Sequence, residues 1–92
     1  MASLKETIRK FDLACRTLAC TDESLHDRLE EAIFEISTLK ERDFNPDYRK
    51  GFIQVMDKIH FYRLSGERSD LQSETALSIL KMCIRLHIET ME

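Results

Sequence analysis

The C-terminal stretch of this chain, residues 76–91, is apolar around most of the circumference of a helix. At about 100° per residue, its apolar side chains and one histidine sweep an arc of roughly 240°. A surface helix needs an apolar stripe of only about 100° or a little more. We therefore expect this segment either to lie at the centre of the fold or to share part of its surface with another chain.

A chain of 92 residues is enough for one domain with one modest core, so we treat residues 1–92 as a single helical bundle domain. Apolar residues make up 42% of the chain and charged residues 34%, which is typical of a globular protein. Only two glycines and one proline occur, and no segment sustains the period-two alternation of a strand. The composition therefore favours helices over sheets.

The expected location is the cytoplasm. No apolar run approaches the ~20 residues of a membrane span, and the first residues, Met1 to Glu6, lack the apolar stretch of a signal peptide. The three cysteines are an odd number, which fits reduced thiols better than a disulfide framework. We therefore expect no membrane-spanning segment and no disulfide bond.

A capping signal marks the start of the first predicted helix, and the order of charges marks the bounds of the second. Ser3 and Glu6 have the spacing of a capping box. The second helix is expected to begin near residue 21 or 22, where acidic residues gather, and to run to Lys40 and Arg42, because this charge order complements the helix dipole. The expected core stripe of the first helix comprises Leu4, Ile8, Phe11, Cys15 and Leu18; that of the second comprises Leu25, Leu29, Ala32, Ile33, Ile36 and Leu39.

The third and fourth helices have clearer boundaries. Asn45 and Pro46 are a natural cap and first helical residue, and Gly66 suits the left-handed end of the third helix. Gly51, inside that helix, either permits a close helix approach or is simply tolerated. The fourth helix is expected to begin at Ser69 and to reach about residue 91. Short connections favour antiparallel neighbours, so the sequence predicts an all-α, four-helix up-down bundle.

The fourth helix carries two apolar seams where a monomer needs one. The first seam comprises Ile79, Met82, Cys83 and Leu86. The second comprises Leu77, Leu80, Ile84, Ile88 and Met91. An uncovered second seam is costly in water, and a two-fold homodimer is the simplest way to cover it. The alternative is that this helix is the most central one and needs no partner chain.

Apolar residues also fall outside the core stripes of the other helices. Leu13, Ile53, Phe61 and Leu64 are of this kind. Phe34 lies about 180° from the core stripe of its own helix. Its neighbours on the helical wheel include Asp27, Glu30 and Glu31. An aromatic ringed by carboxylates has the centre-and-rim anatomy of a docking site, so we predict that a protein partner binds there. A single exposed phenylalanine on a solvated acidic face is the alternative.

No catalytic, cofactor or metal constellation is predicted. The chain has no phosphate loop, dinucleotide fingerprint or nucleophile elbow. Cys83 and His87 are one helical turn apart, but both lie in the apolar arc, where a thiol is inert. Glu23 with His26 and Asp57 with His60 have the carboxylate–histidine spacing of di-iron bundles, yet both carboxylates point away from the core. We expect no enzyme activity.

Two other functions fit part of the sequence. The stretch from His60 to Gly66 is similar in outline to histidine phosphotransfer modules, which implies a relay through His60. The third helix also carries a basic set that could contact nucleic acid phosphates, although the net charge of −3 opposes this. That set comprises Arg49, Lys50, Lys58 and Arg63.

Surplus apolar surface without a catalytic constellation is typical of a protein that acts by binding. The sequence therefore predicts a non-enzymatic protein-interaction module of the regulatory, adaptor or inhibitor kind. We expect it to form a homodimer through its last helix and to bind a further protein of unspecified identity.

Overall fold

The computed structural model of the protein describes residues 4–20 and 22–90, and the side chains of residues 5–20 and 22–87. Over these residues the chain forms four α-helices, one short 3-10 helix and no strand. The elements are α1 (Leu4–Ala19), α2 (Leu25–Ile36), η1 (Glu41–Asp43), α3 (Pro46–Leu64) and α4 (Ser69–Thr90). The prediction of an all-helical bundle is confirmed for this part of the chain. None of these helices has both the length and the apolar content needed to cross a bilayer.

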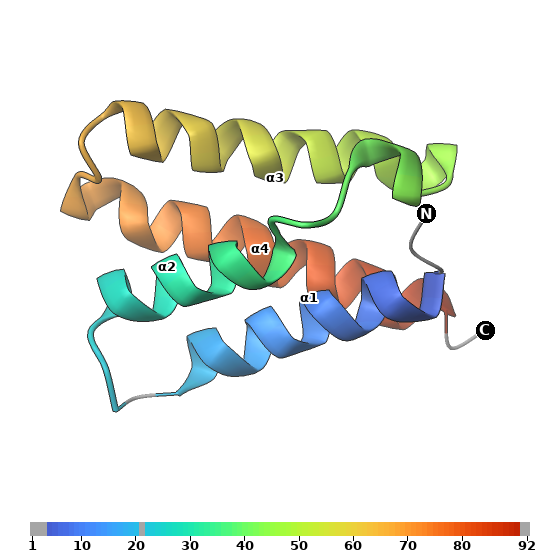
Figure 1. Ribbon diagram of the computed structural model, residues 1–92, viewed down its shortest axis with the longest axis horizontal. Helices are drawn as coiled ribbons and strands as arrows, with labels where there is room; N and C mark the ends of the chain where they lie inside the picture. The colour runs from blue at the N-terminus through green and yellow to red at the C-terminus, as the bar shows by residue number, and fades with distance from the viewer. Residues whose placement is uncertain (1–3, 21, 91–92) are drawn as a thin grey trace.

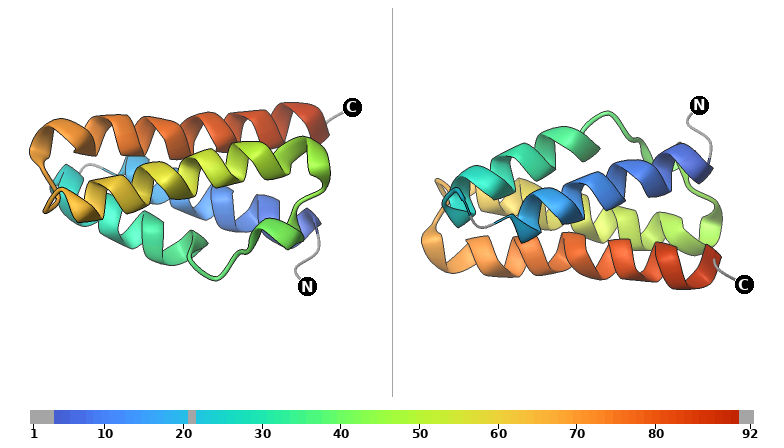
Figure 2. Two further views of the ribbon diagram at one scale, coloured as in Figure 1. Left: turned by 90° about the horizontal axis from the view of Figure 1, so that it is seen from above. Right: turned by 90° about the horizontal axis from the view of Figure 1, so that it is seen from below.

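The helices pack as two neighbouring pairs that share one core (Figures 1 and 2). α1 lies beside α2, α3 lies beside α4, and α4 also packs on α1 and α2. Three phenylalanine rings meet at the centre of the aromatic core: the centroids of Phe44 and Phe52 are 4.4 Å apart and stacked, and Phe11 meets Phe44 edge-on at 6.2 Å. Such pairs stabilise a core beyond the area that they bury.

Polar contacts fix the register within each pair. Between α1 and α2, Thr17 Oγ1 donates to Glu35 Oε1 at 2.7 Å, and Arg28 Nη1 donates to the Leu18 carbonyl at 2.7 Å. The other pair is tied at two levels. The Arg85 guanidinium donates to the Asp47 carbonyl at 2.8 Å, near the start of α3 and the end of α4. The Lys58–Glu74 ion pair joins the later part of α3 to the early part of α4.

The predicted bounds of the second helix were wrong at both ends. α2 begins at Leu25 rather than near residue 21 or 22, because Ser24 is its cap and accepts the Asp27 N–H. α2 ends at Ile36, where the Ser37 hydroxyl donates to the Phe34 carbonyl at 2.7 Å. Serine side chains compete with helical hydrogen bonds in this way. Lys40 and Arg42 therefore lie beyond the helix and do not complement its dipole.

The segment after α2 is anchored by a buried ring and an arginine. The Asp43 carboxylate accepts the Lys40 N–H at 2.8 Å and closes η1. Phe44 is buried, and Arg49 donates to its carbonyl at 2.9 Å and to the Glu41 carbonyl at 3.0 Å. This network satisfies loop carbonyls that no helix covers.

The predicted start and end of the third helix are confirmed. α3 begins at Pro46 after Asn45, although the Asn45 side chain makes no capping hydrogen bond. At its end Gly66 has φ 79°, and its N–H donates to the Arg63 carbonyl. The Glu67 N–H donates to the Tyr62 carbonyl at 3.0 Å, which completes a Schellman motif. Glu67 also has a positive φ of 60°, which a non-glycine residue rarely adopts.

Two details of helix packing bear on the expectations from the sequence: the buried face of α1 and the surroundings of Gly51. On α1 the buried face contains Thr7, Phe11 and Ala14, whereas Ile8 is only half-buried. The stripe is therefore rotated from the one expected. On α3, a Cβ at Gly51 would lie 3.1 Å from both the Met82 sulfur and the Arg85 guanidinium. Glycine there leaves room for the ends of these two α4 side chains. The predicted cap Ser3 lies outside the described residues.

Candidate interaction surface

The outward face of α4 exposes large apolar side chains. Leu77 is 50% exposed and Ile84 is 54% exposed, whereas Ile79 and Leu86 on the same helix are 0% exposed. Residues 77 and 84 are seven positions apart, so they share one face, which lies opposite the buried seam. Leu80 is half-buried and packs against the core. The side chain of Ile88 and the whole of Met91 lie outside the described residues.

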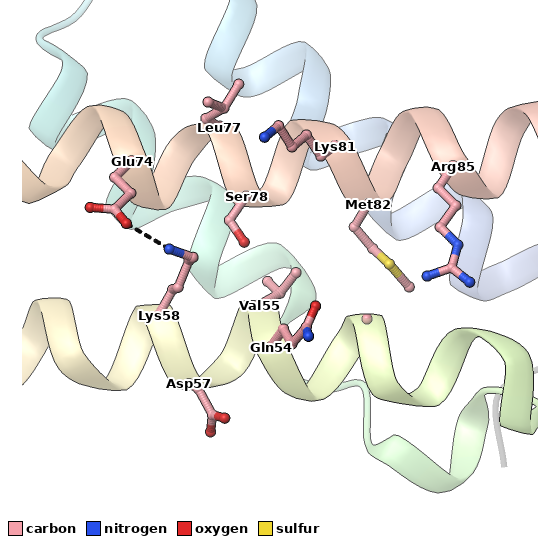
Figure 3. Close-up of a pocket in the computed structure, with 11 residues that line it drawn as sticks. Gln54, Val55, Asp57, Lys58, Glu74, Leu77, Ser78, Lys81, Met82 and Arg85 are labelled. Atoms are coloured by element: carbon pink, nitrogen blue, oxygen red, sulfur yellow. Dashed lines mark hydrogen bonds and ion pairs between the residues drawn. The ribbon is translucent and has the colours of Figure 1, made fainter.

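A groove between α3 and α4 adjoins this face (Figure 3). It encloses a cavity of about 700 Å³. Val55 and Met82, both buried, supply apolar lining, and the absent side chain of Gly51 widens the groove. In Figure 3 Leu77 extends away from α3, so it stands at the rim rather than inside the groove. The groove therefore borders the exposed apolar face instead of covering it.

Charged side chains surround the groove. Lys58 Nζ and Glu74 Oε1 meet across it at 2.6 Å, as Figure 3 shows. Lys81 and Arg85 line the α4 wall, and Arg85 also lies over the ring of Tyr48, with its guanidinium carbon 5.5 Å from the ring centroid. The residues that line this cavity include neither histidine nor cysteine. The groove thus offers shape, apolar contact and charges of both signs.

The acidic face of α2 is arranged only partly as the sequence predicts. Phe34 is 76% exposed, the largest value among the exposed large apolar residues that the structure describes. Asp27 and Glu31 are exposed as well. Glu30 is half-buried, and its Oε2 lies 3.4 Å from Arg63 Nη2 on α3. Glu30 therefore faces the α2–α3 side, and its carboxylate is engaged with an arginine.

Three of the four basic residues proposed for nucleic acid contact are engaged within the chain. Arg49 binds loop carbonyls, Lys58 pairs with Glu74, and Arg63 pairs with Glu30. Lys50 is exposed. Each engaged side chain would have to exchange its partner for a phosphate, which weakens binding. The nucleic acid function remains a prediction from sequence.

His60 is exposed on α3, and Gly66 lies beyond the end of that helix. A phosphotransfer histidine needs a solvent-facing imidazole, which this position provides, but Gly66 lies six residues further along the chain and outside the helix. The relay through His60 also remains a prediction.

Cys83 has the environment of an inert thiol. Its side chain is buried, and burial together with the neighbouring Cys15 thiol raises its pKa from 9.0 to about 12. A catalytic thiol needs a lowered pKa. His87 is exposed and its Nε2 lies 3.4 Å from Asp12 Oδ1. The apolar arc of α4 thus contains a histidine that faces solvent and an aspartate rather than the core.

Sequence reasoning missed one group of side chains that the fold brings together. One ligand atom each from His26, Glu30 and Glu67 lie within 4.8 Å of one another. The spacing of His26 and Glu30 by four residues places them on one face of a helix, but no sequence signal places Glu67 beside them. The carboxylates that the sequence pairs with histidine, Glu23 and Asp57, are exposed.

Comparisons of the chain with models of known protein families, with curated proteins and with solved structures find no significant match.

Proposed function

We propose that this chain is a non-enzymatic protein-interaction module, built as an up-down bundle, that pairs with a second copy of itself through the outward face of α4. One observation carries the proposal: Leu77 and Ile84 are about half exposed on the face opposite the buried seam. Burying a leucine or isoleucine fully is worth ~1.5–3 kcal/mol, so covering the exposed half of each contributes about 1 kcal/mol.

A two-fold arrangement is the simplest partner geometry for this face. In an isologous interface the same patch serves both chains, so each Leu77 and each Ile84 is buried once and the gain doubles. Charged residues of both signs, Glu74 and Lys81, flank the apolar positions. A two-fold axis across α4 can place unlike charges opposite each other at the rim.

The test is the dimer dissociation constant of charge variants, measured by sedimentation velocity over a concentration series. Ile84→Asp and Leu77→Asp should each raise the dissociation constant by about tenfold or more, because each removes apolar contact and buries a carboxylate. Leu13→Asp is the matched control: Leu13 on α1 is 49% exposed, close to the 50% of Leu77, but lies on another helix.

The control variant should keep the dissociation constant of the unaltered protein. An unchanged constant in both α4 variants, with helical content retained by circular dichroism, contradicts the proposal. So does an equal loss in Leu13→Asp, because that result would indicate a general loss of fold or solubility rather than a specific interface.

The Phe34 face is the second contact surface that we propose, for a different protein. Its support is an aromatic side chain exposed to 76% beside the exposed carboxylates of Asp27 and Glu31. Once a binding protein is available, Phe34→Ala and Glu31→Lys should each weaken its capture, whereas Ile53→Ala on α3 should not. If neither α2 variant weakens it, this surface is not the docking site.

We also propose a cytoplasmic location. The support is the odd number of cysteines, three in 92 residues, together with an exposed thiol at Cys20. Exposed free thiols persist in reducing compartments and are oxidised outside them.

A further inference from the structure

We propose that His26, Glu30 and Glu67 form a binding site for a divalent transition metal ion of the zinc type, which ties α2 to the turn between α3 and α4. One ligand atom from each residue lies within 4.8 Å of the others, and all three residues are half-buried. The site lies apart from the α4 surface and does not depend on dimer formation.

The three side chains come from two segments that the fold holds in fixed positions. His26 and Glu30 are one turn apart on α2, so both extend from the same face. Glu67 is held by the Schellman motif that ends α3, where its N–H donates to the Tyr62 carbonyl. Gly66 is the left-handed residue of that motif, and Glu67, which follows it, also has a left-handed backbone with φ 60°. The backbone therefore holds all three ligand residues in place, two on α2 and one in the turn after α3.

Tyr62 orients the imidazole. The Tyr62 hydroxyl lies 3.1 Å from His26 Nδ1, and the tyrosine side chain is buried. With the proton on Nδ1, the ring donates to the tyrosine oxygen and Nε2 presents its lone pair. This is how an outer hydrogen bond sets the tautomer of metal-binding histidines.

One long distance and one unpartnered oxygen point to a shared cation. His26 Nε2 and Glu67 Oε1 are 4.0 Å apart, which is too long for a hydrogen bond. Two ligands on one tetrahedral zinc ion lie about 3.3 Å apart, given bond lengths of ~2.0–2.2 Å, so small side-chain rotations close the site. Glu30 Oε1 is a buried oxygen that accepts no hydrogen bond among the described residues. A buried carboxylate oxygen without a partner is costly, and a bound cation would satisfy it.

The charge and ligand chemistry select the ion. Two carboxylates, one arginine and one neutral imidazole give the cluster a net charge of −1, because Arg63 lies 3.4 Å from Glu30 Oε2. One nitrogen and two oxygen ligands suit Zn²⁺, Co²⁺ or Mn²⁺ better than Ca²⁺ or Mg²⁺, which take oxygen ligands. Water would complete the coordination. Arg63 holds the second oxygen of Glu30 and leaves the buried one for the metal.

The experiment is thermal unfolding of the full chain with and without added Zn²⁺, followed by circular dichroism. Saturating Zn²⁺ should raise the Tm of the unaltered protein by about 5 °C or more, because only the folded chain holds the three ligands together. His26→Gln and Glu67→Gln should each abolish the rise. His60→Gln and Cys20→Ser should keep it, because both residues are exposed and lie outside the cluster.

Co²⁺ gives a second readout that does not depend on stability. The unaltered protein should show the visible d–d bands of bound Co²⁺ without sulfur charge-transfer absorption, since no thiol belongs to the site. An absent Tm shift together with absent Co²⁺ bands overturns the proposal. So does a shift that persists in His26→Gln, or one that disappears in Cys20→Ser, because either result would place the metal elsewhere.

Discussion

The two faces of α4 carry the same kinds of residue and have opposite surroundings. On the inner face Ile79 and Leu86 are fully buried, whereas on the outer face Leu77 and Ile84 are half exposed. Helix propensity does not distinguish the two faces, because leucine and isoleucine occur on both. The position of the other helices decides the difference: α1, α2 and α3 all pack on α4, and Ile79 and Leu86 are the side chains that this packing buries. The number of apolar residues on a helix therefore indicates how much apolar surface must be buried. It does not say whether the same chain or a second chain buries it.

The largest contrast is expected between two leucine truncations on this one helix. Leu86→Ala removes a fully buried side chain and should lower the free energy of unfolding by about 2–5 kcal/mol. Leu77→Ala should change the unfolding free energy of the monomer by less than about 1 kcal/mol. Denaturant unfolding at low protein concentration measures both values. Equal losses would show that the outer face is part of the monomer's core.

Thiol reactivity sharpens the same comparison. Cys83 is on the buried face of α4, with a pKa raised from 9.0 to about 12, whereas Cys20 is exposed. Three pKa units lower the thiolate fraction on the order of a thousandfold, so iodoacetamide at pH 8 should modify Cys20 long before Cys83. Mass spectrometry of the alkylated peptides resolves the order. Modification of Cys83 at the rate of Cys20 would mean that the inner face opens readily.

The same thiol links stability to pH. The fold holds the Cys83 thiol neutral, whereas an unfolded chain releases that proton near pH 9. This contribution to stability is therefore complete below pH 9 and is lost as the pH rises from 9 toward 12. Replacing Cys83 with alanine should remove this part of the alkaline loss. Identical alkaline profiles for the two proteins would contradict the burial of the thiol.

A smaller effect is expected from a pair of threonines on α1. Thr7 Oγ1 is buried and neither accepts nor donates a hydrogen bond among the described residues, whereas the Thr17 hydroxyl donates to Glu35 at 2.7 Å. Thr7→Val should raise the unfolding free energy by up to about 1 kcal/mol, and Thr17→Val should lower it by about 1 kcal/mol. Chemical denaturation of both variants provides the comparison. A loss of stability in Thr7→Val would indicate that its hydroxyl is satisfied.

The sequence predicted correctly those helix boundaries that a proline or a glycine sets at its own position. The Asn45–Pro46 start of α3 and its Gly66 end are confirmed, because proline and glycine restrict or release the backbone at their own positions. The end of α2 was mispredicted. Leu39 is buried and has helical spacing from Ile36, yet it lies in the loop after the helix. Periodicity cannot tell a buried loop residue from a buried helical one.

The surface residues likewise include some whose position the sequence predicted and some whose position it did not. The wheel placed Leu13, Phe34, Ile53, Phe61 and Leu64 outside the core stripes, and all five are exposed. It could not place Glu67 beside His26, because that proximity depends on how α2 packs and on the left-handed turn after α3. The engagement of Glu30 by Arg63 is likewise a tertiary contact.

Light scattering of the unaltered protein over a wide concentration range tests the central claim most directly. The exposed Leu77–Ile84 face predicts a mass that rises with concentration and levels off at twice that of one chain. A mass that stays at one chain up to the highest concentration reached would contradict it, and the outer face of α4 would then be an uncovered surface of a monomer.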